Sequence, residues 1–196
     1  MRNNDANEVP LEIYYPEGDA YKENKKEMIS DSSEFKKFRV TDNLRENTMH
    51  EFFSWMRFVM FDENYITLID FEARAANKSS YYDDSDDEGR QDNNRGFRAK
   101  ELPALSIQNE TRVLVRMKLE CMKVLAGYAT SLEEDLKILE DDAEGSGPKP
   151  LTENMRNAVL MRSGEKKVLK YLMDTSDIML PLFKMTLQDA KKSVKG

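Results

Sequence analysis

The residue types that carry most enzyme chemistry are scarce in this chain. Its 196 residues contain one cysteine, Cys121, and one histidine, His50. A thiol and an imidazole within reach of each other can act as a nucleophile and its base. Cys121, however, falls on the apolar side of a helical pattern, which predicts a buried structural cysteine. His50 stands at the predicted start of another helix, and we expect it to be a surface or capping residue.

Metal and cofactor signatures are equally sparse. A single histidine excludes sites built on a histidine pair, and a single cysteine excludes cysteine-based zinc fingers and an intramolecular disulfide. The acidic residues 83–88 lack the glycine and the closing glutamate of an EF-hand loop. The Gly-x-Gly at 145–147 is isolated inside a proline-bounded linker and is a very weak cofactor signature. We therefore expect no catalytic, cofactor-binding or metal-binding residue in this chain.

Composition favours a mainly helical protein. Eight Gly and six Pro are few for a turn-rich all-β chain. No apolar run is long enough for a transmembrane helix, and the first residues lead into no apolar signal segment. A pI near 5.0 argues against broad nucleic-acid binding, which needs a basic face. We expect an intracellular protein, cytoplasmic or nuclear, with no nucleic-acid partner and no membrane partner.

The first forty residues predict short strands around one helix. Residues 1–10 are polar, and we expect this N-terminus to be disordered. A β-type run at 11–15 is ended by Pro16, and a second short strand is predicted at 35–40. The charged stretch 21–29 between them predicts a helix of low amphipathicity.

The strongest apolar block follows. Thr48 and Glu51 have the spacing of a capping box and precede a wide apolar helical face that runs to Met60. Another helix is predicted at 63–76. The acidic, low-complexity stretch 77–100 predicts a disordered insertion.

Helical periodicity is clean from Asn109 onward. The apolar residues recur at steps of three and four, which predicts one long helix that ends near Gly127. Thr130 and Glu133 have the spacing of a second capping box and predict the start of the next helix. The acidic side chains after Thr130 also suit the positive end of a helix dipole.

The last segment predicts another long helix. After a linker at 145–150, Thr152 precedes a helical pattern in which Pro181 should produce a kink or an end. Gly164 within this pattern marks either a break or a close helix contact. The chain as a whole predicts a mainly α fold, a multi-helical bundle-like lobe with one or two short N-terminal strands, as a single domain over 11–196.

Two stretches carry a specific motif. Tyr128 to Asp135 reads Tyr-Ala-Thr-Ser-Leu-Glu-Glu-Asp, and Arg162 to Lys166 reads Arg-Ser-Gly-Glu-Lys. This resembles Tyr-x-Thr-Thr-x-Glu-Glu-Asp followed by Arg-x-Ala-x-x-x-Arg-x-Gly-Glu-Lys, the pattern of the C-terminal substrate-binding domain of Rubisco large-subunit methyltransferase-type SET-domain protein methyltransferases. The matching motif residues are Thr130, Glu133, Glu134, Asp135, Arg162, Gly164, Glu165 and Lys166.

The resemblance is specific over residues 109–172 and weaker over 11–76. It implies a helical lobe that follows a catalytic SET lobe and helps to hold a protein substrate, whose target is lysine or histidine. The SET lobe itself is not visible, so we expect no catalytic site in this chain alone. S-adenosylmethionine is expected only with a SET lobe. The implied partners are a protein substrate and an intramolecular SET lobe.

The motif residues also have a structural interpretation. Arg162 and Lys166 are four residues apart and share one helix face. We hypothesise that they meet Glu134 or Asp135 across a helix interface, with Gly164 permitting close approach.

Other functions remain open at this point. A free-standing, non-catalytic helical interaction scaffold is the alternative, and a small enzyme is a third possibility. A substrate-binding lobe should carry an open apolar patch where its SET lobe docks, because large exposed patches are unusual on monomers.

Overall fold

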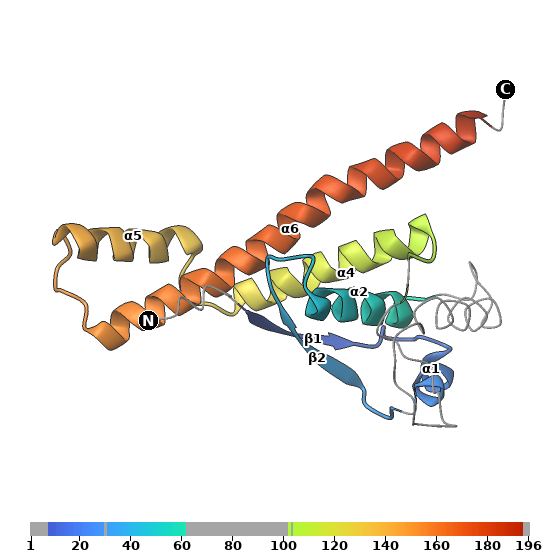
Figure 1. The fold of residues 1–196 in the computed structure, drawn as a ribbon, viewed down its shortest axis with the longest axis horizontal. Coiled ribbons are helices and arrows are strands. Elements are labelled where there is room, and N and C mark those ends of the chain that lie inside the picture. The colour runs from blue at the N-terminus through green and yellow to red at the C-terminus, as the bar shows by residue number, and fades with distance from the viewer. Residues whose placement is uncertain (1–7, 30, 62–101, 103, 194–196) are drawn as a thin grey trace, which may run out of the picture. The chain divides into compact units, whose positions relative to one another are not determined.

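The computed structural model describes residues 8–29, 31–61, 102 and 104–193. Helices dominate this part of the chain, so the mainly α prediction is confirmed. The predicted helix at 63–76 and the predicted insertion at 77–100 lie outside the described residues. Figure 1 labels the elements, which in chain order are β1 (Val9–Tyr14), α1 (Lys22–Met28), β2 (Phe35–Val40), α2 (Asn47–Val59), α4 (Ile107–Ala126), α5 (Leu132–Glu144) and α6 (Glu153–Ser193).

Two compact units can be distinguished. The Trp55 unit consists of Ile13–Lys36 and Arg45–Val113, and the α6 unit consists of Met1–Glu12, Lys37–Leu44 and Leu114–Gly196. The prediction of a single domain over 11–196 stays a prediction.

The two predicted strands form one antiparallel sheet. The second strand has the predicted bounds, whereas β1 begins at Val9, two residues earlier than expected. Val9, Leu11 and Ile13 are buried and alternate with less buried positions, as expected for a strand with one covered face. Pro10 is tolerated because an edge strand can lack one backbone donor.

Helix α2 supplies the largest apolar side chains of the Trp55 unit. Met49, Phe52, Trp55 and Met56 are at most 2% exposed and follow helical spacing. The predicted capping box at Thr48 and Glu51 is wrong, because α2 begins at Asn47 and Thr48 already lies in its first turn. A capping residue needs an extended backbone, and that conformation falls on Glu46, whose side chain makes no capping bond.

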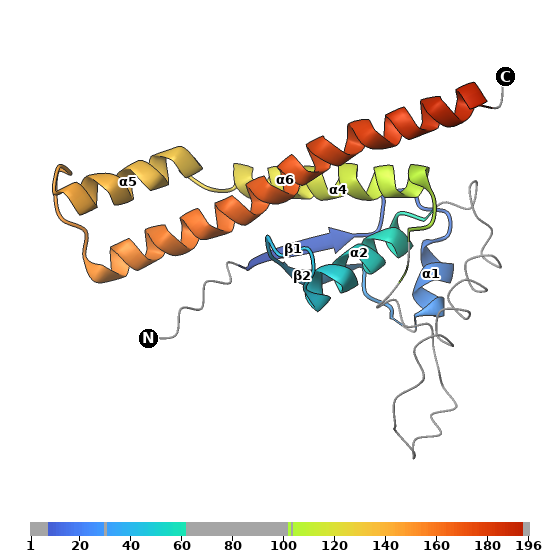
Figure 2. The same cartoon turned by 45° about the horizontal axis from the view of Figure 1, so that its top comes forward.

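The three later helices form the core of the α6 unit. Both views place α5 beside the first part of α6 and the end of α4 beside its middle (Figures 1 and 2). Helix α6 continues through Gly164 and Pro181, so neither residue ends it. A proline within a helix removes one backbone hydrogen bond, and the later turns of the helix can still form. Among the described residues, no helix is both long and apolar enough to cross a membrane.

Cys121 lies in the interior of the α6 unit, as predicted. Its side chain is 0% exposed, and burial, reinforced by the neighbouring Glu120 carboxylate, raises the pKa of its thiol to about 12. Only the thiolate is a good nucleophile. We therefore expect iodoacetamide at mildly alkaline pH to leave Cys121 unmodified in the native protein and to alkylate it fully in concentrated urea. Intact-mass spectrometry measures this, and native alkylation at the rate seen in urea would contradict it.

Candidate functional site

The predicted motif residues converge where the α4–α5 connection meets α6. At the centre is Lys166, which is 1% exposed. Its ammonium nitrogen lies 2.6 Å from Asp135 Oδ2 and 2.6 Å from the carbonyl oxygen of Thr130. It also donates to Thr130 Oγ1 at 2.9 Å and to the Ser131 carbonyl oxygen at 3.2 Å. This ammonium thus connects the turn before α5 to the first half of α6.

Asp135 is the anion of the cluster and is 0% exposed. Arg162 Nε donates to both of its carboxylate oxygens, at 2.9 and 3.1 Å, and the Thr130 hydroxyl donates to Oδ1 at 2.8 Å. The hypothesis that Arg162 and Lys166 meet Glu134 or Asp135 is therefore confirmed for Asp135. A buried carboxylate needs such partners, because an unpaired buried charge is strongly destabilising.

Tyr128, in the α4–α5 connection, lies against the cluster. The Lys166 ammonium lies 4.9 Å from the centre of the Tyr128 ring, an arrangement typical of a cation–π contact. The Tyr128 hydroxyl donates to Glu165 Oε2 at 2.7 Å. Burial and, second, this bond to the carboxylate raise the pKa of Tyr128 well above its usual value of 10.0. The phenol therefore stays a neutral donor.

The start of α5 differs from the prediction by one residue. Ser131, not Thr130, is the N-cap, and its hydroxyl accepts from the Glu134 N–H at 3.0 Å while the Glu134 carboxylate accepts from the Ser131 N–H at 2.6 Å. The capping box is therefore Ser131 with Glu134, and Thr130 is left to bind Lys166 and Asp135. Glu133 forms an exposed pair with Lys170 at 3.1 Å.

The capping box leads to a stability prediction. We expect Ser131→Ala to lower the free energy of unfolding by about 1 kcal/mol, because the Glu134 N–H loses the hydroxyl that accepts its hydrogen bond. Glu134→Gln should have a smaller effect, since a glutamine oxygen can replace the carboxylate oxygen. Urea unfolding followed by circular dichroism measures both. A Ser131→Ala protein as stable as the unmodified protein would contradict this role.

The pKa of Asp135 predicts a pH dependence. Hydrogen bonds from Arg162, then Lys166 and Thr130, hold it well below its ordinary value of 3.8, although burial opposes them. As the pH falls below about 4, the unfolded chain therefore binds a proton at Asp135 before the folded chain does, and folding stability is lost. We expect the stability difference between the protein and Asp135→Asn to be full above a pH of about 5 and to shrink below about 4. Urea unfolding over this range tests it, and a difference that does not change with pH would contradict it.

The cluster orients helices and has no free reactive group. Each charged side chain at its centre already has an oppositely charged partner, and four oxygen acceptors surround the three N–H groups of the Lys166 ammonium. Gly164 is buried within the continuous helix α6 beside these residues. The geometry supports the structural interpretation of the motif, in which these side chains hold α5 against α6.

The remaining candidates for chemistry are His50, Cys121 and groups of metal-binding side chains. His50 is an exposed residue of α2, and the buried Cys121 thiol is not accessible as a nucleophile. Among the described residues, no three His, Cys, Asp or Glu side chains are grouped so that they could hold a metal ion.

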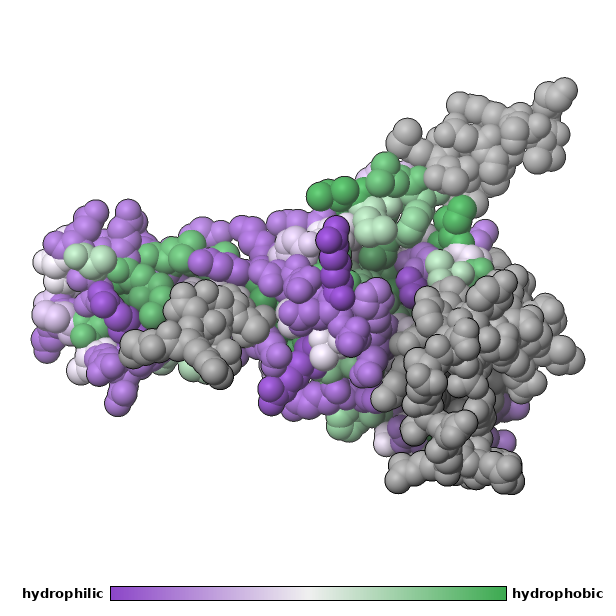
Figure 3. Space-filling view, viewed as in Figure 1, coloured by the Kyte–Doolittle hydropathy of each residue, from purple (hydrophilic) through white to green (hydrophobic). Residues whose placement is uncertain are grey.

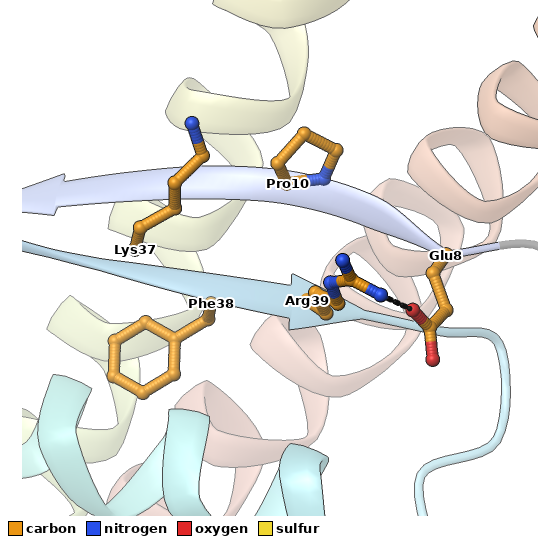
Figure 4. A pocket seen from close by; sticks show the side chains of 5 residues that line it. All are labelled: Glu8, Pro10, Lys37, Phe38 and Arg39. Atoms are coloured by element: carbon orange, nitrogen blue, oxygen red, sulfur yellow. Dashed lines mark hydrogen bonds and ion pairs between the residues drawn. The ribbon is translucent and has the colours of Figure 1, made fainter.

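An open depression lies along the sheet and is lined by Glu8, Pro10, Lys37, Phe38 and Arg39. Figure 4 shows Pro10 and Lys37 on one side of the strands and Phe38 pointing to the other side. Arg39 is already paired with Glu8 at 3.0 Å. Lys37 is paired with Glu12 at 3.4 Å, so each charged side chain that lines this depression already has a charged partner.

Sequence reasoning missed a buried lysine in the Trp55 unit. Lys25 of α1 is 1% exposed, and its ammonium nitrogen lies 2.6 Å from Asp19 Oδ2. It also donates to the carbonyl oxygens of Val59 at 3.1 Å and Phe61 at 2.7 Å, at the end of α2. A cation is favourable at a helix C-terminus, where carbonyl groups lack partners. Nothing in the pattern of 21–29 distinguishes Lys25 from the lysines beside it.

A second missed contact holds α2 and the start of α4 within the same unit. Arg57 Nε donates to both carboxylate oxygens of Glu110, at 2.9 and 3.0 Å, and Arg57 Nη1 donates to the Leu102 carbonyl oxygen at 2.7 Å. Asn109 Nδ2 in turn donates to the Arg57 carbonyl oxygen at 3.1 Å. These partners are about fifty residues apart, and no local pattern relates them.

Solved structures with a similar fold are proteins longer than this chain. It resembles the SET domain of LSMT bound to methyllysine and AdoHcy (TM-score 0.63, 17% identity) and Rubisco LSMT bound to AdoMet (TM-score 0.63, 18% identity). It also resembles Rubisco LSMT bound to sinefungin and monomethyllysine (TM-score 0.60, 17% identity). Each match covers 94% of this chain and 37% of the other chain. At this identity, the likeness shows the fold.

The family is shown by the sequence itself. A search of the curated proteins found no match. A protein-family model described as Rubisco LSMT substrate-binding matches residues 16–169. That range includes the Lys166–Asp135–Arg162 cluster and most of the described helices. The chain belongs to the Rubisco LSMT substrate-binding family.

Proposed function

We propose that this chain is the protein-substrate-binding lobe of a SET-domain protein methyltransferase whose target is lysine or histidine. The observation that carries this proposal is the family match over 16–169, together with a chain that spans 37% of the length of the solved LSMT structures. A lobe of this kind holds a protein substrate while a separate SET lobe performs the methyl transfer. The Lys166–Asp135–Arg162 cluster would then fix the helix geometry on which binding depends.

An exposed apolar face on α4 supports docking of a second lobe. Val115, Leu119 and Met122 are 41%, 54% and 47% exposed. Their spacing of four and three residues places them on one side of the helix. We name these three residues the α4 face and propose that it contacts the SET lobe.

S-adenosylmethionine enters this proposal only with the SET lobe. Within the described ranges, the depression along the sheet is open, and its one guanidinium is paired with a carboxylate. These residues do not fit the cofactor, so we assign no residue of this chain to it.

The alternatives are less favoured. A free-standing interaction scaffold would explain the helical fold but not the family match over 16–169. A small enzyme would need an accessible reactive group, and Cys121 is 0% exposed.

Calorimetric titration with S-adenosylmethionine tests the proposal. The 196-residue chain and a version extended at its N-terminus to include a SET lobe are titrated in parallel. We expect no binding by the chain and micromolar binding by the extended protein. Binding by the chain alone would contradict the proposal, because a cofactor site would then lie within these residues.

The docking face has its own test. In the extended protein, Leu119→Glu should expose the SET lobe to limited proteolysis, because a charge replaces an apolar contact. In the 196-residue chain, the same substitution should change the free energy of unfolding by less than about 0.5 kcal/mol, since residue 119 is exposed. Lys137→Glu, on the exposed side of α5, is the matched control and should leave the proteolysis pattern unchanged. An unchanged pattern for Leu119→Glu would argue against docking on this face.

A further inference from the structure

Helix α6 carries a second exposed apolar surface, on a different face from its contact with α4. Leu160, Tyr171, Ile178 and Leu182 are 49%, 40%, 68% and 53% exposed, and we name them the α6 stripe. At 100° per residue, these four positions fall within a narrow band along one side of the helix. Figure 3 shows hydrophobic atoms gathered over α6 just before its grey end.

The contact with α4 leaves this side uncovered. Lys118 of α4 is paired with Asp177, one residue before Ile178 and therefore a quarter turn away from the stripe. Ile178 remains the most exposed member of the stripe, and Met179 beside it is 36% exposed.

The spacing of the α6 stripe is symmetric about Tyr171. Leu160 and Leu182 lie eleven residues before and after it. A two-fold axis through Tyr171 would therefore place Leu182 of one chain opposite Leu160 of an antiparallel copy. Such an isologous contact uses the same surface twice. Ile178 would come opposite Gly164, which is buried and carries no side chain, so that Ile178 would pack on the side chains that flank Gly164.

One flank of the stripe carries opposite charges that follow this symmetry to within one residue. On this flank, the exposed Lys167 and Asp174 lie four residues before and three residues after Tyr171. Lys167 of one chain would therefore lie one residue, about 1.5 Å along the helix, from the position opposite Asp174 of the second copy. On the other flank, Met161 and Met179 are 68% and 36% exposed. Apolar side chains in the centre and reciprocal charges at the edge are the arrangement of paired antiparallel helices.

We propose that the α6 stripe binds a second copy of this chain, with two α6 helices antiparallel around Tyr171 and Lys167 of each chain paired with Asp174 of the other. The inference is independent of the proposed function, because it uses a different face from the one assigned to the SET lobe. A second copy fits this surface better than an unrelated partner, because the same helix carries Leu160 and Leu182 at equal distances from Tyr171 and both members of an ion pair, Lys167 and Asp174, in the order that an antiparallel copy complements.

Sedimentation equilibrium of the 196-residue chain, from low micromolar to several hundred micromolar, tests the proposal. We expect a concentration-dependent rise to twice the chain mass of 22.8 kDa. Ile178→Glu should weaken association by about 100-fold, because the charge is buried without a partner at two symmetric places. Leu119→Glu, on the α4 face, is the matched control and should associate normally. Circular dichroism verifies that each variant is folded.

Exchanging the charges of Lys167 and Asp174 tests whether the chains associate in this arrangement or without specificity. Lys167→Glu and Asp174→Lys should each weaken the dimer by about tenfold, because each creates two like-charge contacts. The double variant should restore the original affinity. A chain that stays monomeric at the highest concentration, a dimer unaffected by Ile178→Glu, or a double variant no tighter than the single ones would overturn the proposal.

Discussion

Asp135→Ala should lower the free energy of unfolding by about 3–5 kcal/mol. The substitution leaves the Lys166 ammonium, which is 1% exposed, without the anion 2.6 Å away. It also removes the acceptor of both Arg162 Nε contacts and of the Thr130 hydroxyl. Removing one partner of a buried ion pair costs more than the pair contributes, because the remaining charge is desolvated and uncompensated. Urea unfolding monitored by far-ultraviolet circular dichroism measures the change.

Two further variants test whether the effect of Asp135→Ala comes from the buried ion pair. Glu133→Ala, two residues earlier in α5, removes an exposed pair with Lys170 and should cost less than about 1 kcal/mol. A double-mutant cycle with Lys166→Met should show strong coupling, since the double variant no longer contains the unpaired ammonium. If Asp135→Ala were no more destabilising than Glu133→Ala, the cluster would not hold α5 on α6.

Lys25→Met is the second substitution with a large expected effect, about 3–5 kcal/mol. It keeps most of the side-chain volume but removes the ammonium that binds Asp19 and the carbonyl oxygens of Val59 and Phe61. The Asp19 side chain is 8% exposed, so its carboxylate is left with little access to water. Trp55, the single tryptophan and 2% exposed, reports the unfolding of this unit by fluorescence.

The control lies in the same helix. Lys22 is paired with Glu34, and the two side chains are 32% and 58% exposed. Lys22→Met should therefore change the unfolding free energy by less than about 1 kcal/mol, as is usual for solvated pairs. Equal effects of Lys22→Met and Lys25→Met would show that the buried contacts of Lys25 contribute nothing beyond a surface charge.

The start of α5 shows how far sequence reasoning reaches. The pattern correctly predicts a helix after the α4–α5 connection, an acidic first turn and a cation pair on α6. It places the cap one residue too early, at Thr130, because Thr-x-x-Glu and Ser-x-x-Glu both occur there. With Ser131 as the cap, Glu134 is bound to the helix start and Asp135 is turned toward α6. Each residue turns an α-helix by about 100°. A shift of the cap by one residue therefore changes which carboxylate faces α6 and is buried.

The sequence by itself determined the class of the elements, their approximate positions and the family motif, because periodicity and motif spacing are local properties of the chain. Only the tertiary structure decided that Asp135 is the buried anion, that Lys25 caps α2, and that the sides of α4 and α6 away from their contacts stay exposed. These facts depend on segments about thirty residues or more apart in sequence. A lysine carries the same side chain in water and in a core, and only its partners from distant elements determine whether its charge is desolvated.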